Sequence, residues 1–145
     1  MKSPVSQSDY EALAEVRYRI RRFVNFSEAS AREVGLEPQQ HQLLLAIRGL
    51  VGGVPPTIRC LAERLQIQHN SAVELVRRSV DNGLVVKRAS ERDGREVLLE
   101  IAPKGRRLLE RLAVAHRTEL RSMAPVLLGA IGVLVGDDRA SMRAR

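Results

Sequence analysis

The chain has 145 residues, with 24 Lys and Arg against 17 Asp and Glu, which gives a net charge of +7. This length suits one compact domain with a hydrophobic core. Aromatic residues make up only 3%, so the core must be built from aliphatic side chains, which favours packed helices. The charge favours a polyanionic partner, nucleic acid before an anionic membrane, although a role in solubility alone explains it equally well. The single cysteine, Cys60, excludes an internal disulfide, and no secretory signal opens the chain, so we expect a cytoplasmic protein.

The first two predicted elements are helices. Ser8 and Glu11 have the spacing of a capping box, which predicts a helix start at Ser8, and Gly35 is a typical C-terminal cap. Pro38 suits the first position of a second helix, because its missing N–H would be unpaired there in any case. The glycines and prolines of residues 52–56 then interrupt regular structure.

A short helix, a tight turn and a further helix are predicted next. Thr57 is a suitable cap for a third helix that runs to about Leu65. After a turn, a fourth helix is predicted over His69–Asn82, and Gly83 closes it. Residues 85–89 and 97–101 then alternate in polarity on either side of a charged turn, which predicts two antiparallel strands in a hairpin.

The remaining residues are predicted to form two helices and a tail. Pro103 begins a long helix, and Pro125 is expected to begin another. The apolar run Val126–Val135 is about half as long as a bilayer span requires, so we interpret it as a packing surface and expect no membrane partner. Residues 137–145 are expected to form a polar, frayed tail.

The fourth predicted helix has two distinct faces. At 100° per residue, Ala72, Leu75 and Ser79 fall on an apolar side, whereas Glu74 and Arg77 fall on a polar one. Short or forked hydrogen-bonding side chains of this kind suit base edges in a DNA major groove, and the helix start suits phosphate. An ordinary amphipathic helix with a solvated face remains an alternative. The candidate DNA contacts on this helix are Gln68, His69, Asn70, Ser71, Glu74, Arg77 and Arg78.

The predicted hairpin adds basic residues, so that it resembles the wing that follows a helix-turn-helix. Arg92 and Arg95 lie in its turn, where a projecting arginine can enter a narrow minor groove. Asp93 is available to fix one arginine by a charge-assisted bond. A merely solvated turn is the alternative.

The segment Leu61–Gly105 resembles the DNA-binding lobe of MarR-family regulators in its DNGLV helix end, its D-x-R wing, its VLLEI strand and its APKG helix start. The earlier run QQHQLLLAI, residues 39–47, is also similar to their second helix. Gly94 and Ser79 depart from the usual family pattern, which is arginine or aspartate at the first position and leucine at the second.

The resemblance implies a mainly α winged helix-turn-helix fold and a ligand-responsive repressor. It further implies a homodimer on a pseudo-palindromic operator, and a small aromatic or lipophilic effector. The implied layout is a single MarR-type domain spanning residues 1–145. Within it, residues 38–102 are the DNA-binding lobe, and residues 8–35 and 103–136 form the dimerisation helices.

Other classes of function fit less well. His41, His69 and His116 lie on separate predicted helices without a metal-ligand spacing, and no glycine-rich phosphate loop is present, so we expect no cofactor, no metal and no enzyme activity. Cys60 is interpreted as inert, although a redox-sensing role remains open. A winged-helix module that contacts protein or RNA, without operator specificity, is the alternative function.

Overall fold

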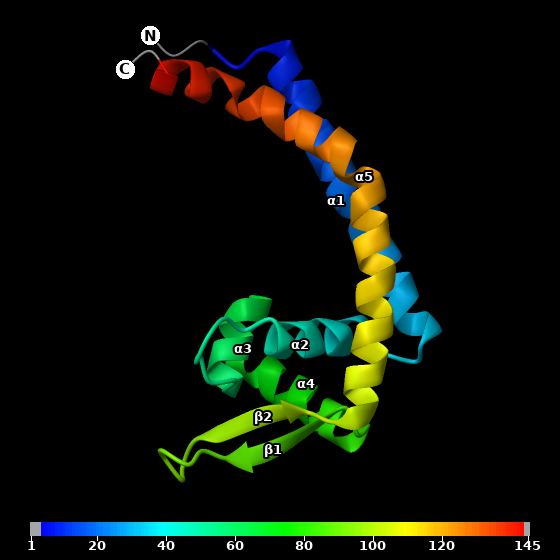
Figure 1. Cartoon of the computed structure of the whole chain (residues 1–145), viewed down its shortest axis with the longest axis vertical. Coiled ribbons are helices and arrows are strands. Elements are labelled where there is room, and N and C mark those ends of the chain that lie inside the picture. Colours follow the sequence, from blue (N-terminus) through cyan, green and yellow to red (C-terminus); the bar gives the residue numbers. More distant parts are fainter. Residues whose placement is uncertain (1–3, 144–145) are drawn as a thin grey trace. The chain divides into compact units, whose positions relative to one another are not determined.

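In the computed structural model, the backbone of residues 4–143 and the side chains of residues 4–136 are described. The secondary structure is mainly helical with one hairpin (Figure 1). The elements are α1 (Gln7–Glu33), α2 (Pro38–Arg48), α3 (Ile58–Leu65), α4 (His69–Asp81), β1 (Val85–Ala89), β2 (Val97–Ile101) and α5 (Pro103–Arg143). The chain divides into two compact units, of which unit 1 comprises residues 1–27 and 114–145 and unit 2 comprises residues 28–113.

Unit 2 holds nearly all of the buried hydrophobic side chains of the described residues. Leu43, Leu61 and Leu75 bring α2, α3 and α4 together with the hairpin, and each is at most 1% exposed. A second cluster joins the ends of α1 and α2 to the start of α5. This second cluster consists of Ala31, Leu36, Leu44, Leu84, Val85, Ile101, Leu109 and Leu112. The predicted apolar side of α4 is therefore confirmed as a core surface.

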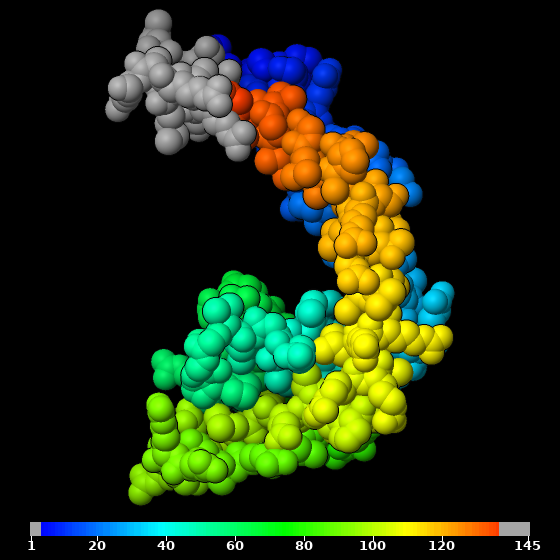
Figure 2. All heavy atoms as spheres, in the orientation of Figure 1, coloured from blue at the N-terminus to red at the C-terminus, as the bar shows by residue number. Residues whose placement is uncertain are grey.

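The hairpin is buried at its base and at Leu99 on β2. β1 and β2 pair antiparallel, as predicted, in a register that runs from Val85 opposite Ile101 to Ala89 opposite Val97. Val85 and Ile101 are buried, whereas the other end of the ladder is exposed. Thr57 also forms a bridge with Leu98, which holds the start of α3 against β2. The turn between the strands consequently stands at the edge of unit 2 (Figures 1 and 2).

The helix boundaries follow local capping chemistry, with one correction. The Cys60 N–H donates to Thr57 Oγ1 at 3.1 Å, which confirms Thr57 as the cap of α3. The predicted capping box at Ser8 and Glu11 is wrong, because Ser6 and Asp9 form it instead, and α1 begins at Gln7. Two serines offered the same three-residue spacing to an acidic residue, so the pattern alone did not choose between them.

The prediction that Pro125 begins a new helix is also wrong. α5 is continuous from Pro103 to Arg143 with Pro125 inside it. Proline keeps a helical φ and loses a single N–H donor, so the neighbouring turns continue the helix past it. By length and composition alone, the stretch Pro103–Gly136 is long and apolar enough to cross a membrane, because α5 extends well beyond the apolar run Val126–Val135. The expected tail is helical in its backbone to Arg143, and its side chains lie outside the described residues.

Unit 1 buries little of its apolar surface. Among its described hydrophobic residues, Ala12 and Met123 are buried. Ser27 on α1 and His116 on α5 lie 2.7 Å apart from Oγ to Nε2, with Phe23 and Phe26 edge-on to the imidazole. The exposed apolar side chains of this unit are Val5, Tyr10, Leu13, Tyr18, Ile20, Val24, Val114, Leu120, Val126, Leu128, Ile131, Val133 and Val135.

Candidate nucleic-acid interface

Helix α4 presents its start and one face to solvent. Gln68 caps it with extended backbone, and no side-chain cap bond is formed there within the described residues. The first N–H groups of α4 are therefore open to a ligand, in contrast to those of α3, which Thr57 caps. The predicted contacts that are exposed on this helix are Gln68, His69, Asn70, Ser71, Glu74 and Arg77.

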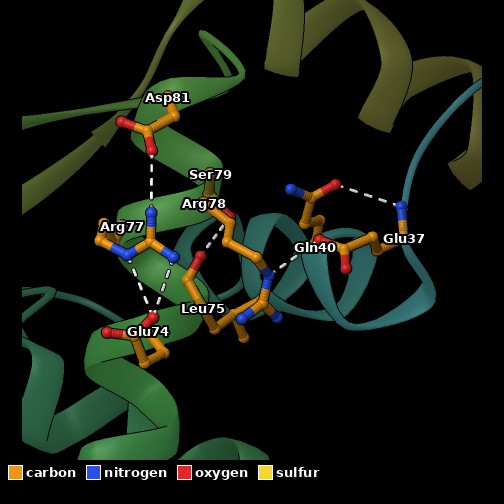
Figure 3. Close-up of polar contacts among 8 residues, drawn as sticks. All are labelled: Glu37, Gln40, Glu74, Leu75, Arg77, Arg78, Ser79 and Asp81. Carbon is orange, nitrogen blue, oxygen red and sulfur yellow. Dashed lines mark hydrogen bonds and ion pairs between the residues drawn. The ribbon is translucent and has the colours of Figure 1, made fainter.

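Arg77 is held on the surface by two carboxylates (Figure 3). Its Nε donates to Glu74 Oε2 at 3.0 Å, and its Nη1 donates to Asp81 Oδ2 at 3.1 Å. Its Nη2 also lies 3.0 Å from Glu74 Oε2 as part of the ion pair. The bond to Glu74 is the main reason that the pKa of Arg77 lies above its ordinary value, so the group stays charged at every pH at which proteins are normally handled. All three side chains remain more than half exposed.

Arg78 lies in a different setting from the other predicted contacts. Its Nε donates to Glu37 Oε2 at 3.1 Å, so it links α4 to the residue that caps α2 (Figure 3). The Glu37 N–H in turn donates to Gln40 Oε1 at 3.1 Å. Arg78 is therefore a contact between helices as well as a candidate DNA contact. No sequence rule connects residues 37 and 78, so the sequence alone did not predict this contact.

Ser79, which departs from the usual family pattern, has its hydroxyl satisfied inside the helix. Its Oγ donates to the Leu75 carbonyl oxygen at 2.8 Å, and the side chain is fully buried. A buried hydroxyl with a partner avoids the cost of an unpaired polar group. Helix α4 thus packs on the core despite the polar residue.

The hairpin turn places Arg92, Asp93 and Arg95 in solvent. Asp93 Oδ1 accepts a bond from the Arg95 backbone N–H at 3.0 Å, whereas the sequence suggested that it fixes an arginine side chain. Asp93 therefore shapes the turn and leaves the Arg95 guanidinium unengaged within the described contacts. Arg88 on β1, in contrast, is paired with Glu100 on β2.

A hollow of about 540 Å³ lies beside the wing within unit 2. Pro55, Pro56 and Leu98 give it apolar walls, and Arg88 and Arg92 lie at its lining. This volume falls within the range of small-molecule sites.

The charge of the interface is balanced locally. On α4, Glu74 and Asp81 match Arg77 and Arg78. In the hairpin, residues 85–101, four basic side chains are likewise matched by four acidic ones. The net charge of +7 therefore arises outside these two elements, and largely from residues 103–136, which hold six basic and two acidic residues.

Sequence reasoning missed two residues of this interface as functional contacts. Asp81 was given no role, although its four-residue spacing from Arg77 indicates an ion pair. Glu37 carried no such signal, because only the packing of α2 against α4 brings it to Arg78. Among the described residues, no group of three or more His, Cys, Asp or Glu is placed to hold a metal ion.

Two helices joined by a tight turn, a docked second helix with an open face, and a hairpin at its edge define a winged helix-turn-helix protein. A sequence model of the MarR family matches residues 34–96, which span α2 to the wing. Solved structures described as MarR-family transcription regulators share the fold of the whole chain. Residues 34–96 are therefore similar to the MarR family of transcription regulators, and the described chain shares its fold with solved structures of that family.

Three similar solved structures illustrate this fold. AbsC, a MarR-family transcriptional regulator from Streptomyces coelicolor, is 15% identical with a TM-score of 0.70, and the match covers 99% of this chain and 100% of AbsC. The repressor CouR, bound to a 23-mer DNA duplex, is 22% identical with a TM-score of 0.63 and coverage of 89% of both chains. BpsR from Bordetella bronchiseptica is 20% identical with a TM-score of 0.62, and coverage is 85% of this chain and 89% of BpsR. No curated protein matches the sequence.

Proposed function

We propose that this protein is a ligand-responsive repressor that binds a pseudo-palindromic operator in double-stranded DNA as a homodimer. The observation that carries the proposal is the placement of α4, whose apolar face is docked on the core while its uncapped start and polar face remain open. A helix presented in this way fits the major groove, with its first turn near phosphate and its polar side chains at base edges.

Within this proposal, α4 and the wing have different tasks. Asn70, Ser71, Glu74 and Arg77 reach base edges and choose the sequence, because they project from the exposed first turns of α4. Arg95 contacts phosphate or the minor groove and supplies affinity, because its guanidinium projects from the turn of the hairpin. Gln68, His69, Arg78 and Arg92 add contacts at the edges of these two elements.

We propose that a second copy of the chain buries the apolar surface of unit 1 in a dimer interface. Leu128 is 65% exposed and Val133 is 49% exposed, although both lie in the most apolar part of α5. A bare apolar surface of this extent marks an interface, and two copies related by a two-fold axis present their α4 helices to two half-sites. A membrane is the competing cover, since α5 passes the length and composition test for a span. Sedimentation of a dimer in detergent-free buffer supports the homodimer, whereas recovery in the membrane fraction contradicts it.

The proposed effector is a small aromatic or lipophilic molecule. BpsR is a protein of the same fold whose DNA binding is regulated by 6-hydroxynicotinic acid, and CouR is described as a repressor. The hollow beside the wing is a suitable site within unit 2, because Pro55 and Pro56 provide apolar contacts and Arg92 provides a cation. An occupant there would touch the residues that support the wing. Such a regulator acts in the cytoplasm, where its DNA lies.

The decisive experiment is selection of bound duplexes from a random pool by the purified protein. A palindromic consensus, with two half-sites about one helical turn apart, is the expected result. For Arg77→Ala, we expect operator binding to weaken by about 1–3 kcal/mol and the base preference to relax at one position of the site. For Arg95→Ala, we expect operator and random duplex to weaken alike and the salt slope to fall by about one unit.

The control and the contrary results of this experiment are equally specific. Arg111→Ala removes an exposed positive charge of unit 2 on α5, which is neither on α4 nor in the wing, and it should leave the consensus unchanged. Absence of any consensus, with a shallow salt dependence, would instead favour a module that contacts protein or RNA.

A further inference from the structure

The face of α4 that would meet DNA is not positively charged, and this inference rests on the proposed DNA-binding function. Glu74, Arg77 and Asp81 together carry a net charge of −1, and each guanidinium nitrogen of Arg77 lies 3.0 or 3.1 Å from an oxygen of one of the two carboxylates. A guanine base needs two N–H groups of an arginine in a fork. Glu74 occupies the side-on fork of Nε and Nη2, so Arg77 can present that fork to a base only when Glu74 releases it, whereas the second N–H groups of Nη1 and Nη2 stay open.

Asp81 has no evident structural reason for its position. It lies in the last turn of α4, where the partial negative charge of the helix end disfavours a carboxylate. Its carboxylate is 62% exposed, and within the described residues its one ion-pair partner is Arg77. Asn82, and not Asp81, provides the C-terminal cap. The role of Asp81 therefore lies in what it does to Arg77.

We propose that Asp81 is a specificity-determining residue that holds Arg77 on Glu74 until operator bases replace the carboxylates. A phosphate of random DNA gains little from Arg77, because the two adjacent carboxylates already balance its charge and repel a further anion. An operator base pair can satisfy both partners, since a base acceptor receives the Arg77 N–H groups while a cytosine amino group donates to Glu74. Asp81 thus lowers binding to random DNA more than binding to the operator.

The test is Asp81→Asn, measured against the selected operator and random duplex over a range of salt. Asparagine keeps the size of the side chain and removes its charge, and it suits a helix end at least as well as aspartate, so the fold is retained. We expect the affinity for random duplex to rise roughly two- to fivefold, as expected when an exposed ion pair is lost. We expect its salt slope to steepen, by at most about one unit, and the ratio of operator to random affinity to fall.

The matched control is Glu63→Gln on α3. Glu63 is exposed and accepts a bond from Gln66 Nε2 at 3.1 Å, and it forms no ion pair with an arginine within the described residues. The Glu63→Gln substitution removes the same charge from the same unit without releasing Arg77. The ratio of operator to random affinity should therefore stay at the wild-type value. An equal change in both variants would overturn the role of Asp81 in favour of a general charge effect.

The remaining outcomes are distinct from one another. Specific binding by the wild type with an unchanged ratio in Asp81→Asn overturns this inference and leaves the proposed function standing. Failure of the wild type to select any DNA sequence overturns the proposed function, and this inference with it.

Discussion

Gly105, in the first turn of α5, lies where no other side chain fits. A Cβ placed there would run into the Leu84 carbonyl oxygen, closer than real Cβ atoms approach, and would also press on Ile101 Cγ2 at 3.1 Å and Leu44 Cδ2 at 3.2 Å. The Leu84 oxygen also accepts a bond from the Ala102 N–H at 2.9 Å, so it cannot retreat without weakening that bond. Gly105→Ala should therefore destabilise unit 2 at the base of the wing.

The expected magnitude follows from two opposing effects. Alanine gains at most about 1 kcal/mol over glycine from helix propensity. Overpacking a filled site costs about 1–3 kcal/mol, and weakening the backbone hydrogen bond adds about 1 kcal/mol. The clash prevails, and the free energy of unfolding should fall by about 1–3 kcal/mol, a substantial part of the 5–15 kcal/mol that is typical of domains.

Urea unfolding followed by far-ultraviolet circular dichroism measures this loss. Gly52→Ala is the matched control, because its Cβ would meet nothing within 4 Å and its φ is not left-handed. The control should be neutral or stabilised by up to about 1 kcal/mol through the unfolded state. A Gly105→Ala protein as stable as the wild type would refute the close packing of α5 against Leu84.

Three further predictions concern the caps, the interface and the cysteine. Thr57→Ala removes the acceptor for the Cys60 N–H and should lower the free energy of unfolding by about 1 kcal/mol, whereas an unchanged midpoint in urea would contradict the cap. Leu128→Glu puts a charge on the exposed apolar surface of α5 and should yield a folded monomer by sedimentation at micromolar concentration, while Glu110→Gln, also exposed on α5, should remain dimeric. Cys60→Ser should leave DNA affinity and its response to peroxide unchanged, and a peroxide effect that vanishes in the variant would assign Cys60 a redox role.

The order of elements was predictable from the sequence because local chemistry sets it. Thr57 forms its cap within three residues, and Gly83 adopts the left-handed φ of +71° that ends α4. The alternation of residues 85–89 and 97–101 defined the strands, and the period of 3.6 residues in α4 separated its buried face from its open one. Glu74 and Arg77 were placed on the open face for the same reason.

Tertiary structure decided the features that depend on distant partners or on competition between equal local signals. Glu37 reaches Arg78 only because α2 packs against α4, and the carbonyl that confines Gly105 comes from the residue before β1. Pro125 had the sequence signal of a helix start, yet the turns on both sides keep α5 continuous through it. The sequence already indicated a packing surface in this part of the chain, but burial depends on the sum of all packing contacts, so only the fold decided which apolar side chains of unit 1 stay exposed.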